Sequence, residues 1–268
     1  MLLLNYSTII DPIFKDVRNR VVELSGIKAG DRVLDVGCGT GDQVFHYAQK
    51  GAIATGVDEN PNMIELAEKN WERRRFNQAT FDIAGATELP FPDGYFDCVS
   101  ISLALHEMKR DEQNKAVSEM KRVVKKKGTL IFVDFQVPLP KNLIAYGIRL
   151  IEFIAGRENH RCFRDYLAQG GLKGILEKAG LKSEREVLLK SGNIQIVKAK
   201  SEKPKAKSAG KKSKMGYSYI CHSEKTLLGR VTEESRRWVE MMRFFAALRM
   251  TTSEGLRMTG RRTQNDSR

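Results

Sequence analysis

Three glycines at alternate positions, Gly37, Gly39 and Gly41, follow an apolar and acidic run in the segment VLDVGCGTGD, residues 33–42. A strand that ends in glycines and leads into a helix brings backbone N–H groups close to a ligand, beside the positive end of the helix dipole. Glycine is needed there because a Cβ would block the approach. The segment by itself is also compatible with an ordinary loop between a strand and a helix.

The spacing and charge of this turn distinguish between nucleotide ligands. The dinucleotide fingerprint is G-x-G-x-x-G, whereas this turn reads G-x-G-x-G and is followed by Asp42. Asp35 would repel a pyrophosphate and suits a cationic ligand better. Asp58, 17 positions after Gly41, can accept hydrogen bonds from both ribose hydroxyls of a nucleoside. The pattern therefore favours a positively charged nucleoside and disfavours an NAD(P)-dependent oxidoreductase.

Short apolar runs alternate with helical patterns from Asp31 to about Lys198. The strands are predicted at RVLDVG, AIATGVD, FDCVSISLAL and GTLIFVDF, and the helices at 42–49, 61–73 and 111–126. This alternation implies right-handed crossovers in a doubly wound sheet. KSEREVLLK and NIQIVKAK flank the dipeptide SG and predict a closing β-hairpin. We therefore expect an α/β, Rossmann-like, mostly parallel sheet that ends in an antiparallel hairpin.

The predicted domain organisation has a cap, a body and a tail. Residues 1–30 predict an N-terminal helical cap, and the body spans 31–200 with an apolar lid insert at about 137–163. Ligands of such sheets bind outside the carboxyl ends of the strands, where the cap and the insert would close over them. A basic linker is predicted at 201–216, and a tail at 217–268 with one amphipathic helix and otherwise disordered.

The positive charge is concentrated in the tail. The net charge of the chain is +13, of which residues 1–200 contribute +4 and residues 201–268 contribute +9. This division argues against a nucleic-acid groove in the body. It makes the tail a candidate for peripheral contact with an anionic membrane, with RNA as a weaker alternative. The start lacks a signal-peptide pattern and the four scattered cysteines form no metal-binding spacing, so we expect a cytoplasmic protein without structural zinc.

Together these motifs resemble those of the class I S-adenosylmethionine-dependent methyltransferases. The resemblance covers roughly residues 31–198 and includes VLDVGCGTG, GVDENPNMIELA, ELPFPDGYFD and the closing hairpin. It implies a seven-stranded sheet, S-adenosylmethionine as the cofactor and in-line methyl transfer that requires no metal. VDFQVP and FRDYLAQGGLKGILEKAGL resemble a narrower group, the ubiquinone/menaquinone-biosynthesis C-methyltransferases. The longer N-terminal signature of that group is missing.

The resemblance also implies roles for single residues around the cofactor. The backbone of Gly37, Cys38 and Gly39 would lie beside its amino-acid and ribose parts, Asp35 would support the loop and the ammonium group, and Asp58 would hold the ribose hydroxyls. The predicted cofactor-binding positions are Asp35, Gly37, Cys38, Gly39, Gly41, Asp58, Glu59, Asn60, Met63, Gly85 and Ala86.

The adenine end departs from the family pattern. Glu59, Asn60 and Met63 would flank the base, but Gly85 stands where the family usually has the aspartate that reads the adenine amine. We expect the backbone or Thr87 to replace that contact.

The acceptor is predicted to be a small, apolar molecule, quinone-precursor-like or lipid-like. Five residues from the cap and the insert are predicted to line its pocket: Tyr6, Phe14, Tyr146, Ile151 and Phe153. The alternative is that they simply pack on the sheet, as apolar helical stripes usually do. His106, which follows FDCVSISLAL, is the predicted catalytic base because an ordinary histidine pKa of about 6.5 allows proton removal at neutral pH.

The alternatives differ in what the chain does with its ligand. His106 also fits a hydrogen-bonded structural histidine. The whole chain also fits a non-catalytic S-adenosylmethionine-binding protein, or a methyltransferase of another small-molecule or RNA acceptor. Nothing in the sequence indicates an oligomeric state.

Overall fold

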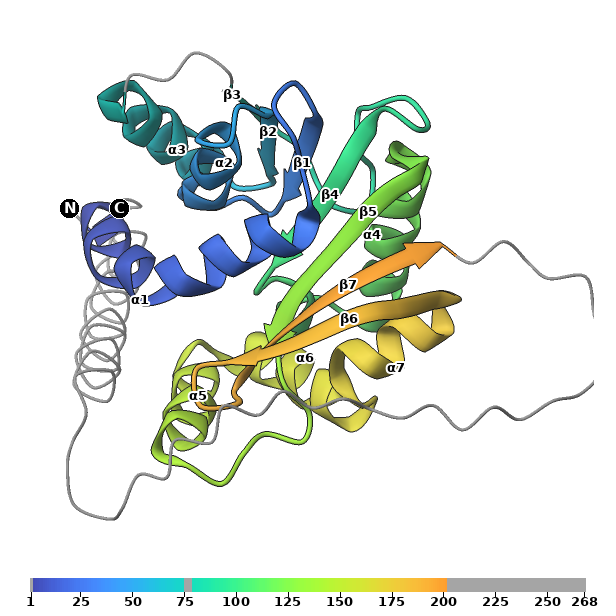
Figure 1. Cartoon of the computed structure of the whole chain (residues 1–268). Helices are drawn as coiled ribbons and strands as arrows, with labels where there is room; N and C mark the ends of the chain where they lie inside the picture. Colours follow the sequence, from blue (N-terminus) through green and yellow to red (C-terminus); the bar gives the residue numbers. More distant parts are fainter. Residues whose placement is uncertain (1, 75–78, 202–268) are drawn as a thin grey trace, which may run out of the picture.

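The computed structural model describes residues 2–74 and 79–201, with the backbone alone for residues 2–10. The described strands are β1 (Arg32–Val36), β2 (Ile53–Asp58), β3 (Ala79–Ile83), β4 (Phe96–Ser102), β5 (Val124–Phe135), β6 (Leu181–Leu189) and β7 (Ile194–Ser201). They form one seven-stranded sheet in the order β3-β2-β1-β4-β5-β7-β6 (Figure 1). β7 runs antiparallel to both β5 and β6, and the other pairs are parallel. The predicted fold class is confirmed.

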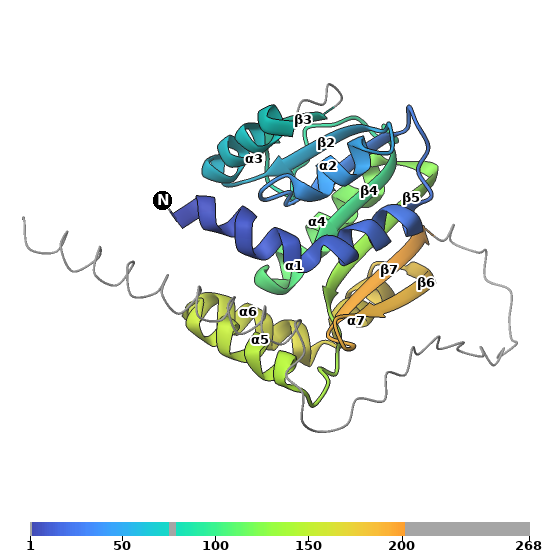
Figure 2. The same cartoon turned by 60° about the vertical axis from the view of Figure 1, so that its left-hand side comes forward.

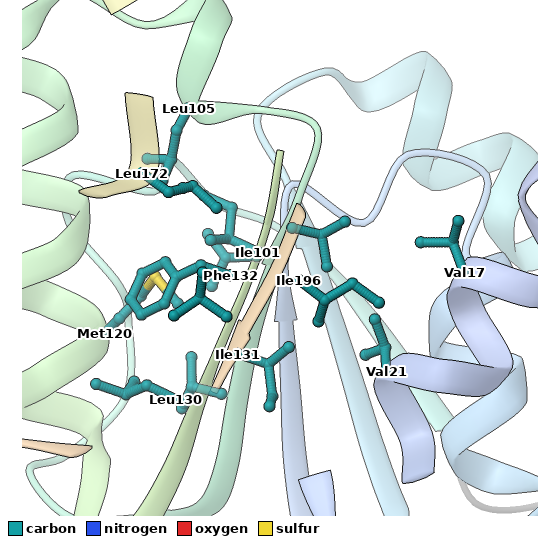
Figure 3. Packing of buried hydrophobic residues seen from close by; sticks show 14 of the residues in the cluster. Val17, Val21, Ile101, Leu105, Met120, Leu130, Ile131, Phe132, Leu172 and Ile196 are labelled. Carbon is teal, nitrogen blue, oxygen red and sulfur yellow. The ribbon is translucent and has the colours of Figure 1, made fainter. Parts of the chain in front are cut away.

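Helices cover both faces of this sheet. They are α1 (Leu2–Ser25), α2 (Asp42–Ala48), α3 (Pro61–Arg74), α4 (Arg110–Val123), α5 (Leu143–Ile154), α6 (Arg157–Ala168) and α7 (Gly171–Lys178), with a single 3₁₀ turn, η1, at Leu105–Glu107. Figure 3 shows Met120 and Leu172 on one face of the strands, and Val17 and Val21 on the other. The sheet residues between them are fully buried, which explains why their strands are apolar runs without alternation.

Helix and strand boundaries differ from the prediction at several places: β3 was not among the predicted strands, and β4 ends at Ser102 instead of continuing to Leu105. The helix predicted at 111–126 ends at Val123, because β5 already begins at Val124 and pairs it with Phe96 of β4. Strand pairing overrides the helical pattern of the lysine run that follows. The apolar insert holds two helices, α5 and α6, which lie side by side in Figure 2. The predicted linker and tail at 201–216 and 217–268 lie outside the described residues, apart from Ser201.

The order of the strands determines where a ligand can bind. The chain runs from β1 outward to β2 and β3, and then returns to place β4 on the other side of β1. At such a switch point the loops after β1 and β4 diverge and leave a crevice at the carboxyl end of the sheet. α1 lies between α2 and α5 in both views and runs past this end (Figures 1 and 2). Among the described residues, no helix is long and apolar enough to cross a bilayer.

Candidate functional site

A cavity of about 750 Å³ opens at the carboxyl ends of the central strands. One part of its wall comes from the glycine turn and the end of β2, and another from α1, the end of β5 and α5. Nine predicted cofactor-binding positions line it: Asp35, Gly37, Cys38, Gly39, Asp58, Glu59, Asn60, Met63 and Ala86. His106 lines it as well, whereas Gly41 and Gly85 do not.

The glycine turn takes a left-handed backbone at each of its glycines. Gly37, Gly39 and Gly41 have φ angles of 65°, 52° and 76°. A Cβ on Gly39 would meet no atom within 4 Å, so this position faces open space. A Cβ on Gly41 would lie 2.8 Å from the Phe81 ring, so this glycine is needed for packing. Gly39 therefore leaves room for a ligand, and Gly41 lets α2 start against the sheet.

Asp58 at the end of β2 is hydrogen-bonded to the backbone on both sides. Its Oδ2 accepts from the Gly39 N–H at 2.9 Å, and its Oδ1 accepts from the Asn60 N–H at 2.9 Å. These bonds fix the carboxylate beside the glycine turn and leave lone pairs for a further donor.

Asp35 lies under the turn with only 3% of its surface exposed. Its register partner on β4 is Ser100, whose hydroxyl donates to Asp35 Oδ1 at 2.6 Å. Burial raises the pKa of Asp35 to about 7, against the opposing effects of the Ser100 hydroxyl and the Arg18 guanidinium. A cation in the cavity would therefore favour the ionised form of this carboxyl.

α1 is attached to the turn by a cluster of buried polar groups. Thr40 Oγ1 donates to the Asp11 carboxylate at 3.0 and 3.1 Å. Arg18 forms ion pairs with Asp11 at 2.9 Å and with Asp42, at the start of α2, at 3.1 Å. Arg74 closes the cluster by pairing with Asp42 at 2.7 Å. Arg18 also lines the cavity, beside Phe14 and Val17 of the same helix.

A second group of polar side chains meets at the ends of β4 and β5. His106 Nδ1 lies 2.7 Å from Asp134 Oδ1, and Asp134 also accepts from the backbone N–H groups of His106 and Phe135. His106 Nε2 lies 3.5 Å from Glu152 Oε1 of α5 and 3.8 Å from Glu107 Oε1. The His106, Asp134 and Glu152 side chains are buried, and the ring packs 4.6 Å from that of Phe135.

The charge of His106 differs from the sequence-based expectation. Burial lowers its pKa, but the carboxylates of Asp134 and Glu152 favour the imidazolium more strongly and hold the pKa well above 6.5. An imidazolium has no lone pair with which to accept a proton. The base role was predicted from the ordinary histidine pKa of about 6.5, and His106 does not keep that pKa in the folded protein.

Of the five residues predicted for the acceptor wall, Phe14 and Ile151 line the cavity and Tyr146 and Phe153 do not. Tyr146 and Phe153 are each 60% exposed and are not among the lining residues. Phe153 packs edge-on against His160, and the Arg149 guanidinium lies over the Tyr146 ring. The side chain of Tyr6 lies outside the described residues. The apolar lining from the cap and the insert is made by Phe14, Val17, Ile148, Ile151 and Ala155.

Four functional candidates were missed from the sequence: Arg18, Gln43, Asp134 and Glu152. Gln43 is buried, lines the cavity and has no hydrogen-bond partner for its Nε2 among the described residues. Asp134 could have been identified from the sequence, because it is an acid near the carboxyl end of an apolar strand. Glu152 interrupts an apolar stretch and, like Arg18, belongs to no motif.

Comparisons with known protein families and sequences agree on one class. A family model described as a methyltransferase domain matches residues 33–128. An uncharacterized methyltransferase of Synechocystis is 32% identical over 182 residues, which cover 68% of this chain and 81% of that protein. A ubiquinone/menaquinone biosynthesis C-methyltransferase of Pectobacterium carotovorum is 30% identical over 192 residues, which cover 65% of this chain and 76% of that protein.

The solved structures show the same fold. An S-adenosylmethionine-dependent methyltransferase from Aquifex aeolicus aligns with a TM-score of 0.52 over 68% of this chain and 88% of its own. The two sequences are 22% identical, so this likeness concerns the arrangement of the sheet and its helices.

Proposed function

The chain belongs to the S-adenosylmethionine-dependent methyltransferases, and from this we propose that it methylates a small, largely apolar acceptor, quinone-precursor-like or lipid-like. One observation carries the proposal. The same cavity is lined by the glycine turn and Asp58 and by the apolar side chains of α1, β5 and α5. Donor and acceptor would thus share one enclosed space, as in-line transfer requires.

The residues present fit the cofactor. Gly39 faces open space, and Asp58 has lone pairs left for the ribose hydroxyls. The unpartnered amide of Gln43 offers a donor to the carboxylate of the amino-acid part. Thr87 lines the cavity near Gly85, so we propose that it takes the place of the missing adenine-reading aspartate.

The protein's own contribution is to position the acceptor and to remove water from around it. When bound, S-adenosylmethionine supplies the methyl group, and its sulfur keeps the electron pair of the broken carbon–sulfur bond. The side chains of Phe14, Val17, Ile148 and Ile151 hold the acceptor and exclude water from it. Orientation of two reactants in this way supplies about 7–11 kcal/mol in favourable cases.

The proposed function is tested with labelled S-adenosylmethionine and a lipid and metabolite extract, followed by mass spectrometry of methylated products. We expect a labelled product with the wild-type protein and at least a tenfold loss in Asp58→Asn, since one charge-assisted hydrogen bond contributes about 1.5–3 kcal/mol. Asp82→Asn is the matched control, because Asp82 is exposed on β3 and does not line the cavity. Cofactor binding without product across the extracts would instead favour a non-catalytic binding protein.

A further inference from the structure

Glu152 is a buried carboxylate that keeps one oxygen free. It lies on α5 with 6% of its surface exposed, and it lines the cavity. Its Oε1 faces His106 Nε2 at 3.5 Å, whereas its Oε2 has no hydrogen-bond partner among the described residues. A buried acceptor atom without a donor costs free energy, commonly about 1–3 kcal/mol. Such an atom on a cavity wall is best explained by a ligand that brings the donor.

The neighbours of Glu152 determine what it can accept. Asp134 receives three hydrogen bonds, one of them from His106 Nδ1, and so fixes the ring with Nε2 toward Glu152. With His106 as an imidazolium, the ring supplies a positive charge 3.5 Å from Glu152 Oε1. Glu152 Oε2 is left as a hydrogen-bond acceptor on the cavity wall, where little water competes for it.

The same neighbours discriminate between acceptor charges. Glu107, Glu112 and Glu152 all line the cavity, whereas His106 is the cation that faces Glu152. Arg18, the other cation on the wall, is already paired with Asp11 and Asp42, so a carboxylate or phosphate on the acceptor would meet these anions with little compensation. The remaining wall beside Glu152 is apolar, with Phe135, Ile148 and Ile151.

We propose that Glu152 binds the hydroxyl of a neutral phenol-like or enol-like acceptor and removes its proton, while His106 and Asp134 are positioning residues. This inference rests on the proposed function. In the step that Glu152 performs, the O–H bond of the acceptor breaks, the proton forms a bond to Oε2, and the electron pair stays with the acceptor. The hydroxyl becomes acidic as methyl transfer withdraws electrons, so the transfer of the proton coincides with the chemistry.

The test measures binding of three probes to the protein loaded with S-adenosylhomocysteine. The probes are 4-hexylphenol, its methyl ether 4-hexylanisole and the anion 4-hexylbenzoate, with calorimetry as the readout. We expect the phenol to bind at least about tenfold more tightly than the other two, because only the phenol donates to Glu152. Equal binding of the ether or the benzoate, or no saturable binding of the phenol, would overturn the proposal.

Substitutions distinguish the effect of Glu152 from that of an exposed glutamate. Glu152→Leu is expected to weaken phenol binding by about tenfold or more, and Glu152→Gln by less, because the amide oxygen still accepts a hydrogen bond. Glu158→Leu is the matched control, since Glu158 on the neighbouring helix α6 is 72% exposed and does not line the cavity. An unchanged phenol affinity in Glu152→Leu contradicts the inference.

Cofactor affinity is measured in the same samples. S-adenosylhomocysteine should bind the wild type and both Glu152 variants alike, which also shows that the variants are folded. Failure of the wild type to bind it would refute the proposed function. Normal cofactor binding together with unselective probes would refute only the role of Glu152.

Discussion

Asp35 illustrates how the environment of one residue sets the chemistry of a motif. The sequence identifies an acid beside a glycine turn, and the fold then buries this residue of β1 under the turn and raises its pKa to about 7. Near neutral pH this carboxyl responds to whatever charge enters the cavity. A cationic ligand stabilises the carboxylate and expels the proton.

S-adenosylmethionine is therefore expected to bind more tightly as the pH rises toward 7. Below the pKa of Asp35, binding must release a proton, so the affinity should increase by up to about tenfold per pH unit and level off above pH 7. Calorimetry from pH 5.5 to 8.5 measures the slope and the protons released. Asp35→Asn should bind more weakly and without this slope. If the variant kept the same slope, the slope would belong to another group, such as Asp11. Burial raises the pKa of Asp11 to about 6.

A second prediction compares two glycines with matched backbones. Gly39 and Gly30 have φ angles of 52° and 84°, and a Cβ on either would meet nothing within 4 Å. Alanine at each position should reduce the free energy of unfolding by about 1–2 kcal/mol, the cost of left-handed backbone. Only Gly39→Ala should also weaken S-adenosylmethionine binding, by more than about tenfold, because its methyl group enters the cavity. Urea denaturation and calorimetry measure the two effects, and equal affinities would contradict the assignment.

At the scale of elements, α5 shows what a pattern can and cannot predict. Its apolar residues were expected to form a lid, but they occupy both sides of the helix. Ile148 and Ile151 line the cavity, whereas Leu143, Tyr146, Leu150 and Phe153 are exposed. A helix that is apolar on most sides has no stripe to indicate its orientation. The packing of α5 on the following helix α6 decides it, and the residue pattern of α5 alone does not contain that information.

The attachment of α1 gives a prediction at this scale. Arg18→Leu leaves the carboxylates of Asp11 and Asp42 without their shared cation, which should lower the free energy of unfolding by on the order of 3 kcal/mol. Arg20→Leu on the same helix removes only an exposed pair with Glu23 and should cost less than about 1 kcal/mol. Urea denaturation measures both values. Hydrogen exchange should increase along α1 in Arg18→Leu alone; equal losses in the two variants would show that the cluster does not hold the helix.

At the scale of the whole molecule, the two parts of the site differ in how far they could be predicted. The proposed donor part lies within a short stretch of sequence, so the glycine turn and Asp58 could be identified from their motifs. The proposed acceptor part joins Phe14 from α1, Phe135 from β5 and Glu152 from α5. These residues have no common motif because only the sheet topology brings them together.

The described cavity also predicts how the chain tolerates truncation. Every lining residue lies between Phe14 and Asn159. Removal of residues 203–268 should therefore leave S-adenosylmethionine affinity within about twofold and the melting temperature unchanged, because β7 is retained. A liposome assay on the same two proteins tests the proposed membrane contact of the basic tail: the full chain should bind anionic vesicles and the shortened chain should not. A loss of cofactor affinity in the shortened chain would show that the tail contributes to the cofactor site.

The cluster of buried polar groups around Thr40 connects the proposed donor and acceptor sites through one helix, α1. α1 presents Phe14 and Val17 to the cavity, and it is bonded through Asp11 to the turn that faces the donor. A ligand that fixes the position of α1 at one of these contacts would therefore also fix the α1 side chains that the other ligand contacts. By reciprocity, the factor by which the donor improves acceptor binding equals the factor by which the acceptor improves donor binding. The cofactor product, which has lost the transferred methyl group and the sulfonium charge, would give up part of that mutual support and so be released.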